Sequence, residues 1–153
     1  MKTEGPNSYR LELGEGRIIA INGQEDGRFK QSDGKEGIRK IYVVKSGAEV
    51  IYIGSTKQNF RTRLQQGLKP KEKHNYPYKW GALREVEIMI WCFPDQNEET
   101  ENLVEAVEAE LVYLIRKFKC RWPRYQMEIH FHSNISTDEK KTARKIFDRI
   151  YGR

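Results

Sequence analysis

The chain has 153 residues, of which 37% are hydrophobic and 33% charged, and its net charge is +6. That length suits one domain, and six Phe, eight Tyr and three Trp residues are more aromatics than a disordered chain usually carries. The apolar runs are too short to span a bilayer, no signal-peptide core follows the first residues, and the two cysteines form neither a disulfide framework nor a zinc-ligand pattern. We therefore expect an intracellular, cytoplasmic protein.

The charged residues fall into blocks of opposite sign. Residues 35–80 carry 11 Lys and Arg against 3 Asp and Glu, and residues 112–153 carry 11 against 4, whereas residues 81–111 carry 1 against 9. Aromatic residues are interleaved with the cations of both basic blocks. Phosphates favour clustered Lys and Arg because binding releases counterions. We expect a nucleic-acid partner; the alternative is a soluble surface with no such partner.

Residues 1–36 are predicted to form an N-terminal extension. Apolar and polar side chains alternate over residues 8–13, a Gly-Glu-Gly turn follows, and the mostly apolar residues 17–21 return, which is the pattern of a β-hairpin. Residues 24–37 are rich in glycine and charge, which is typical of a loop or linker. The hairpin would therefore be appended to a core that starts near Ile38.

The core opens with a predicted strand pair and a short helix. The β-rich runs 38–44 and 50–53 are joined by a Gly-containing loop, so they are expected to be antiparallel neighbours. Asn59 is a candidate N-cap for a helix over residues 60–66, which should end at Gly67.

Beyond a third predicted strand at 86–91, the helical signals strengthen. One long helix with a single apolar stripe is predicted from residues spaced by three and four, namely Leu103, Val107, Leu111, Leu114 and Phe118. Residues 127–131 alternate as a short strand, and a capping box at 136–139 opens a final basic helix. The predicted fold class is α/β: a small central, mostly antiparallel three-stranded sheet flanked by helices. The N-terminal hairpin is appended to it, as are the C-terminal strand and helix of residues 127–153.

Two tripeptides on the first two core strands carry the most specific signal. The first tripeptide is Lys40-Ile41-Tyr42 and the second is Tyr52-Ile53-Gly54, so their tyrosines are ten positions apart. Arg63 follows on the predicted short helix. Glu110 lies on the long helix, and Pro123-Arg124-Tyr125-Gln126 comes after it. This order resembles the GIY-YIG nuclease superfamily, so residues 37–126 are expected to form a nuclease-like core.

The chain departs from the family pattern at four places, one of which is a spacing from the long helix to Pro123 that is longer than in the repair members. Lys40 stands where the first triplet has glycine, and Gln126 stands where the repair members of the family have asparagine. One extra residue precedes Arg63, so Arg61 is a rival for the role of the arginine.

The resemblance implies a metal-dependent DNA endonuclease. Tyr42 would be the general base or its activator, Tyr52 would hold the water or phosphate, and Arg63 would neutralise charge on the phosphoryl group. Glu110 would bind one divalent ion, Mg²⁺ or alternatively Mn²⁺, which stabilises the leaving oxygen. Because tyrosine is a poor base at its ordinary pKa of about 10, nearby cations would have to lower that pKa.

Other residues are expected to contact the DNA. Gly54 would leave room for the DNA backbone or a phosphate, and a basic loop at 68–80 would lie on the surface. The predicted DNA-binding set is Gly54, Lys57, Arg61, Lys71, Lys73 and His74. For His74 the alternative is a solvated loop position, and for Glu128, His130 and His132 an exposed polar face is favoured over a metal site.

Glu110 also stands out from its helix alone. It lies seven residues after Leu103 and four before Leu114, so it projects from the apolar stripe, where an unpaired carboxylate is costly. The alternatives are the edge of the stripe or a bridge to an arginine such as Arg63. The solvated face of this helix is expected to carry Glu101, Glu105 and Glu108.

Two other functions compete with catalysis. One is a nuclease-derived module that binds nucleic acid without cutting it, and the other is a protein–protein adaptor. The dense cations of the C-terminal helix would repel one another across a two-fold interface, so a monomer is predicted.

Overall fold

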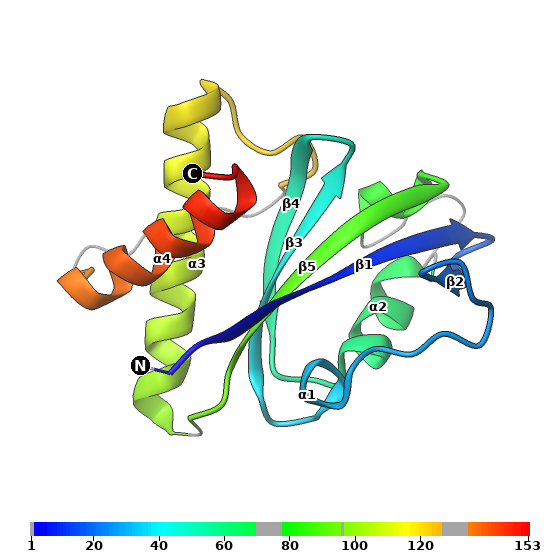
Figure 1. Cartoon of the computed structure of the whole chain (residues 1–153), viewed down its shortest axis with the longest axis horizontal. Coiled ribbons are helices and arrows are strands. Elements are labelled where there is room, and N and C mark those ends of the chain that lie inside the picture. Colours follow the sequence, from blue (N-terminus) through cyan, green and yellow to red (C-terminus); the bar gives the residue numbers. More distant parts are fainter. Residues whose placement is uncertain (1, 70–77, 96, 127–134) are drawn as a thin grey trace.

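A computed structural model describes residues 2–69, 78–95, 97–126 and 135–153. Its centre is a five-stranded sheet in the order β2-β1-β5-β3-β4, in which every neighbouring pair is antiparallel (Figure 1). The strands are β1 (Glu4–Gly14), β2 (Arg17–Ile21), β3 (Arg39–Ser46), β4 (Glu49–Thr56) and β5 (Glu85–Phe93). The α/β class and the three expected core strands are confirmed, and two further strands widen the sheet.

The N-terminal hairpin supplies those two strands, so it is not the appendage that the sequence predicted. β1 pairs with β5 along most of its length, with Tyr9 opposite Ile88 and Leu11 opposite Val86. Tyr9, Leu11 and Leu13 are buried. Their alternation places three apolar side chains on one face of the sheet, where they join the core.

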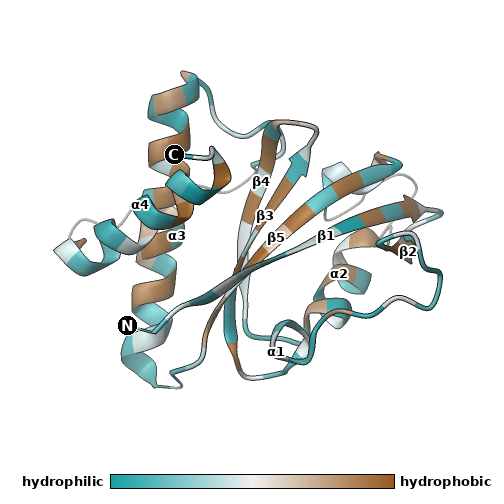
Figure 2. Ribbon diagram, viewed as in Figure 1, coloured by the Kyte–Doolittle hydropathy of each residue, from teal (hydrophilic) through white to brown (hydrophobic). Residues whose placement is uncertain are grey.

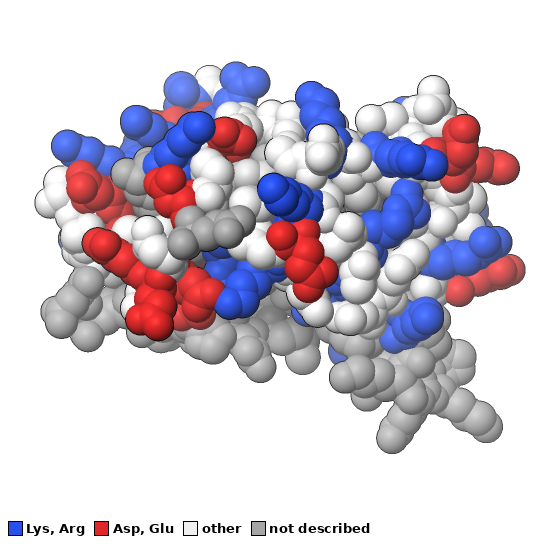
Figure 3. Space-filling model, turned by 90° about the horizontal axis from the view of Figure 1, so that it is seen from below, with Lys and Arg blue, Asp and Glu red and all other residues white. Residues whose placement is uncertain are grey.

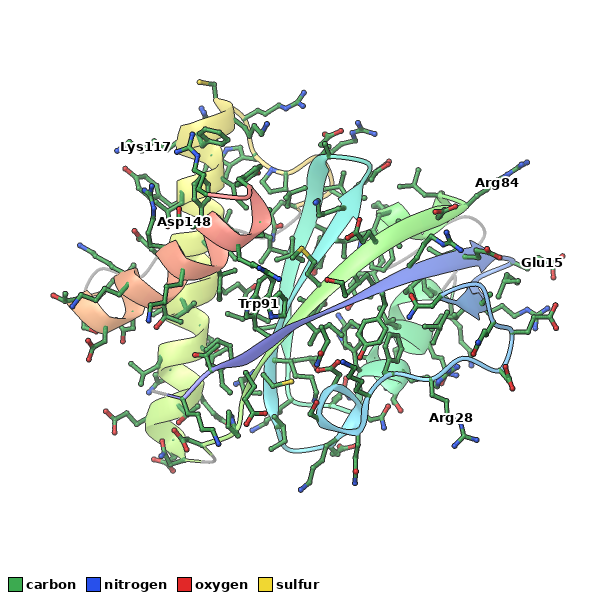
Figure 4. All side chains as sticks on the ribbon, in the orientation of Figure 1. Glu15, Arg28, Arg84, Trp91, Lys117 and Asp148 are labelled. Atoms are coloured by element: carbon green, nitrogen blue, oxygen red, sulfur yellow. The ribbon has the colours of Figure 1, made fainter. Side chains whose placement is uncertain are left out.

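Helices cover both faces of the sheet. The short α1 (Gln31–Gly34) and α2 (Phe60–Leu68) lie on one face, and α3 (Glu98–Lys119) and α4 (Thr137–Ile150) lie on the other (Figure 1). Apolar side chains follow the strands and the inward faces of the helices in two separate clusters (Figure 2). Trp91 of β5 points toward α3 and α4 and belongs to their cluster (Figure 4).

Side-chain caps fix the starts of the helices where the sequence predicted them. Asn59 accepts a hydrogen bond from the backbone N–H of Thr62, and Ser136 forms the predicted capping box with Glu139. α2 does not end at Gly67 but continues through Leu68, and a Cβ on Gly67 would overlap the ring of Tyr78. A 3₁₀ turn (Lys79–Ala82) then leads into β5.

Several predictions fall outside the described residues: the strand at 127–131 with Glu128, His130 and His132, and the loop residues Lys71, Lys73 and His74. Among the helices in the described ranges, none has the length and apolar character needed to cross a membrane.

Candidate active site

Three tyrosines meet on the α2 face of the sheet, and with Arg63 they form what we call the tyrosine cluster. Tyr42 lies on β3 and Tyr52 on β4, with ring centroids 6.0 Å apart, and Tyr78 packs on both rings. Tyr42 is opposite Gly54 across the strand pair, and a Cβ on Gly54 would overlap the Tyr42 hydroxyl. The space that we expected Gly54 to leave for DNA is therefore filled by a tyrosine.

The phenols of the cluster differ in access and in pKa. The hydroxyls of Tyr42 and Tyr78 are 2.5 Å apart, and both side chains are buried, whereas Tyr52 is partly exposed. Burial raises the pKa of Tyr42 well above its ordinary value, and the positive charge of Arg63 only partly opposes this shift. The cations therefore do not lower the pKa of Tyr42 as the sequence suggested, and the phenol stays protonated at neutral pH.

Tyr78 was missed by the sequence analysis because it lies in the segment interpreted as a basic surface loop. Its ring stacks on Trp80 with centroids 4.8 Å apart, and both residues are buried. The signal that could have found it is Gly67, since a glycine within a helix often marks the close approach of another group.

The two candidate arginines of α2 have different partners. The guanidinium carbon of Arg63 lies 4.7 Å from the centre of the Tyr78 ring. Arg61 instead donates to the carbonyl of Gly27 at 2.7 Å and lies near the ring of Phe29. Because successive helical residues are about 100° apart, two positions along the helix point in nearly opposite directions. Arg63, not Arg61, joins the tyrosines.

The acidic residues of α3 face the sheet on its other side. Glu108 accepts a hydrogen bond from the hydroxyl of Ser55 at 2.6 Å. Glu101 pairs with Lys57, and Arg39 lies within 4.0 Å of both Glu101 and Glu105. Of the three glutamates predicted on the solvated face, Glu105 is exposed and Glu101 partly exposed, whereas Glu108 is partly buried and bonded to Ser55.

Glu110 is not brought to the tyrosines. It lies two residues beyond Glu108 and therefore about 200° further around the helix, away from the side that meets Ser55. In the described part of the chain Glu110 makes no ion pair or hydrogen bond. The carboxylate that the structure places beside the second tripeptide is Glu108, because Ser55 directly follows Gly54.

The Pro-Arg-Tyr-Gln segment lies along the free edge of β4. The backbone N–H of Ile53 donates to the Gln126 side-chain oxygen and the Gln126 amide nitrogen donates to the Ile53 carbonyl, both at 3.0 Å. The backbone N–H of Tyr125 donates to the Ile51 carbonyl at 2.9 Å. A glutamine amide supplies both a donor and an acceptor, as an asparagine would, so Gln126 serves to hold this segment on the edge strand.

A second buried polar group lies on the same face, and we call it the aspartate cluster. Asp33 accepts hydrogen bonds from Tyr9, from the Cys92 thiol at 3.1 Å and from the Asn7 amide at 3.2 Å. Lys40 is fully buried, and its ammonium donates to the carbonyls of Lys35, Ile38 and Gln58 at 2.7–2.9 Å. Burial lowers the pKa of Lys40. The lysine that replaces the family's glycine is thus bonded into the core.

An antiparallel sheet with tyrosines on neighbouring strands, an arginine on the next helix and a carboxylate on a long helix defines a nuclease-like domain. In agreement with this, residues 39–121 match the model of the GIY-YIG catalytic domain, which covers more than half of the chain. The chain belongs to the GIY-YIG family. Searches of curated proteins and of solved structures gave no match.

Proposed function

We propose that the protein is a metal-dependent DNA endonuclease that hydrolyses a phosphodiester bond beside β4. The observation that carries this proposal is the position of Arg63, whose guanidinium lies against Tyr78 next to the partly exposed Tyr52. A cation and an accessible phenol together can bind a phosphate. Membership of the family and the net charge of +6 support a nucleic-acid substrate.

The surroundings of each residue suggest its role. Arg63 would neutralise the charge that develops on the phosphoryl oxygens. Tyr52 would hydrogen-bond to the attacking water or to the phosphate. Tyr42 is buried and protonated, so it would act as a positioning residue through Tyr78 rather than as the general base.

A divalent ion fits the oxygen donors of α3 and β4. Mg²⁺ prefers oxygen ligands and commonly binds through one or two carboxylates, with water and substrate phosphates completing its shell. Glu108 and Ser55 offer such oxygens beside Gly54. We therefore favour Glu108 as the residue that would hold Mg²⁺ or Mn²⁺, while Glu110 stays the sequence-based candidate. When bound, the ion would stabilise the leaving oxygen.

The DNA is proposed to lie on the basic part of the surface. Figure 3 shows one face on which acidic side chains gather toward the α3 end, and basic ones predominate toward α2 and β2. Lys57, Lys71, Lys73 and His74 stay predicted DNA contacts. The Arg61 side chain already binds the Gly27 carbonyl, so its contact with DNA would be secondary.

The direct test is cleavage of supercoiled, linear, branched and single-stranded DNA by the purified chain, with Mg²⁺ or Mn²⁺ and with EDTA as the control. We expect metal-dependent cleavage, and for a monomer we expect nicked plasmid to accumulate before the linear product. DNA retention without cleavage on any substrate would favour the inactive binding module instead. A dimer by light scattering, with linear product and no nicked intermediate, would overturn the proposed monomer.

A further inference from the structure

A pocket lies at the start of β4, on the strand that carries Tyr52 further along. It has a volume of about 170 Å³, and its lining includes Ile115 and Lys119 near the C-terminal end of α3 and Tyr151 just after α4. The lining side chains that matter here are Glu49, Lys119, Arg121, Trp122 and Tyr151. We call this the edge pocket.

The edge pocket contains an unsatisfied polar atom. The hydroxyl of Tyr151 is buried and has no hydrogen-bond partner among the residues that the structure describes. Buried hydroxyls are normally paired, since an unpaired one loses its hydrogen bonds to water without replacement. Tyr151 also lines the edge pocket, and a polar ligand there that reached this hydroxyl would satisfy it.

Aromatic rings and cations alternate around the pocket. Trp122 is 36% exposed and Phe118, one helical turn from Ile115, is 40% exposed. The guanidinium of Arg116 lies 5.5 Å from the Trp122 ring, and the ammonium of Lys119 lies 5.2 Å from the Phe118 ring. Exposed rings interleaved with cations are the chemistry of sites that stack unpaired bases and hold their phosphates.

The local charge favours an anion. Glu49 is the one acidic residue in the described lining, and it is already paired with Arg124 at 2.6 Å and Arg121 at 3.7 Å. Lys119 has no acidic partner within the described residues. The pocket therefore keeps an excess of positive charge, and its aromatic wall is suited to a base.

The pocket and the tyrosine cluster lie along the same strand but on opposite faces of the sheet, since Ile115 of the pocket belongs to the α3 and α4 core and Tyr42 to the α2 core. Val50 at the pocket and Gly54 beside Tyr42 are four residues apart on an extended strand, which corresponds to about 13 Å. Between them Tyr125 is bonded to Ile51, and the Arg124 guanidinium lies 5.8 Å from its ring. A stacked DNA strand advances about 3.4 Å per nucleotide, so about four nucleotides match this length along β4, and the strand must in addition pass around the edge of β4 to reach the other face.

We propose that the edge pocket binds an unpaired nucleotide of the same DNA strand whose phosphodiester lies at the tyrosine cluster. The base stacks on Trp122, the phosphate contacts Lys119 and Arg121, and the Tyr151 hydroxyl donates to the nucleotide. This rests on the proposed function and narrows its substrate class to DNA in which a duplex adjoins an unpaired strand, such as a fork or flap.

The test is fluorescence anisotropy of the full chain with a labelled fork and with a blunt duplex of equal length, in EDTA so that nothing is cleaved. The wild type should bind the fork about ten-fold more tightly, and Trp122→Ala or Lys119→Gln should each remove most of that preference. Tyr151→Phe should weaken fork binding by about three-fold without lowering the melting temperature, because its hydroxyl has no partner to lose among the described residues.

Two matched controls keep the comparison specific. Tyr113→Ala removes another exposed ring of α3, and Lys117→Gln removes a cation near the same helix end (Figure 4), but neither residue lines the pocket. Both should bind the fork like the wild type. Equal wild-type affinity for fork and duplex, or equal losses in the control variants, would overturn the proposal.

The experiments distinguish a failure of the proposed nuclease function from a failure of the proposed pocket. If the protein prefers forks through Trp122 and Lys119 but cuts no DNA, the proposed nuclease activity is refuted and the proposed nucleotide binding in the edge pocket stands. A chain that cuts plasmid, yet binds fork and duplex alike, refutes the pocket alone.

Discussion

The tyrosine cluster and the aspartate cluster lie on the same face of one sheet, and their difference separates the proposed site from a scaffold. Both include a residue of β3, since Lys40 and Tyr42 are two positions apart and point the same way. In the aspartate cluster the carboxylate and the ammonium each have three hydrogen-bond partners. In the tyrosine cluster a guanidinium lies against a ring beside a partly exposed phenol. In the first arrangement the polar groups already bond one another, while the second is the one that we propose receives a phosphate.

The largest effect should separate the two arginines of α2. Arg63→Ala should lower the cleavage rate at saturating DNA by about two orders of magnitude or more, as loss of a donor to transition-state charge does. Arg61→Ala should leave that rate nearly unchanged, because its guanidinium binds the Gly27 carbonyl. Single-turnover kinetics of both variants measures this, and the opposite order would move the catalytic role to Arg61.

A substitution in the aspartate cluster should lower the stability of the fold. Asp33→Ala leaves the Tyr9 hydroxyl, the Cys92 thiol and the Asn7 amide without their shared acceptor. We expect the free energy of unfolding to fall by about 3 kcal/mol, as measured by urea denaturation. Asp26→Ala, in the exposed part of the same segment, is the control and should change little. An Asp33→Ala variant as stable as the parent would show that the cluster is not a scaffold.

The smallest expected effect is a difference in reactivity between the two cysteine thiols, Cys92 and Cys120. Burial raises the pKa of Cys92 to about 12, whereas Cys120 is exposed. Thiolate is the reactive form, so iodoacetamide at pH 8 should label Cys120 alone, as read by peptide mass spectrometry. Because the folded-state pKa of Cys92 is raised, its contribution to stability should be lost as pH rises from about 9 toward 12. Labelling of both thiols in the folded protein would contradict this burial.

Local signals were enough to predict much of the fold. The caps at Asn59 and Ser136, the strand pair of the two tripeptides and the long helix are all set by residues within a few positions of one another. The partner of β1 was not predictable in this way, because β5 lies more than 70 residues away and an alternating pattern does not specify which strand it pairs with. The hairpin was therefore placed outside the sheet.

The same limit explains the choice between the glutamates of α3. The predicted stripe included Leu103 and Phe118, but the buried residues are centred on Val104, Val107 and Ile115. α3 packs against both the sheet and α4, so apolar residues face two directions and a single stripe misjudges which side meets β4. The grouping of Tyr42, Tyr52 and Arg63 could be predicted from their order within residues 42–63 and its resemblance to the family motif, whereas the side of α3 that meets β4 depends on tertiary packing.

We propose that the nuclease site uses both faces of the edge strand β4 at Gly54 and Ser55, with the tyrosine cluster on the α2 face and Glu108 on the α3 face. Its most direct test is Mg²⁺-dependent nicking of supercoiled plasmid by Glu108→Gln and Glu110→Gln, two nearly isosteric changes on one helix. We expect Glu108→Gln to lose nicking while it still binds DNA, and Glu110→Gln to cut at the parent rate. Loss of nicking in Glu110→Gln, with Glu108→Gln still active, would contradict the account and place the carboxylate on the other side of α3.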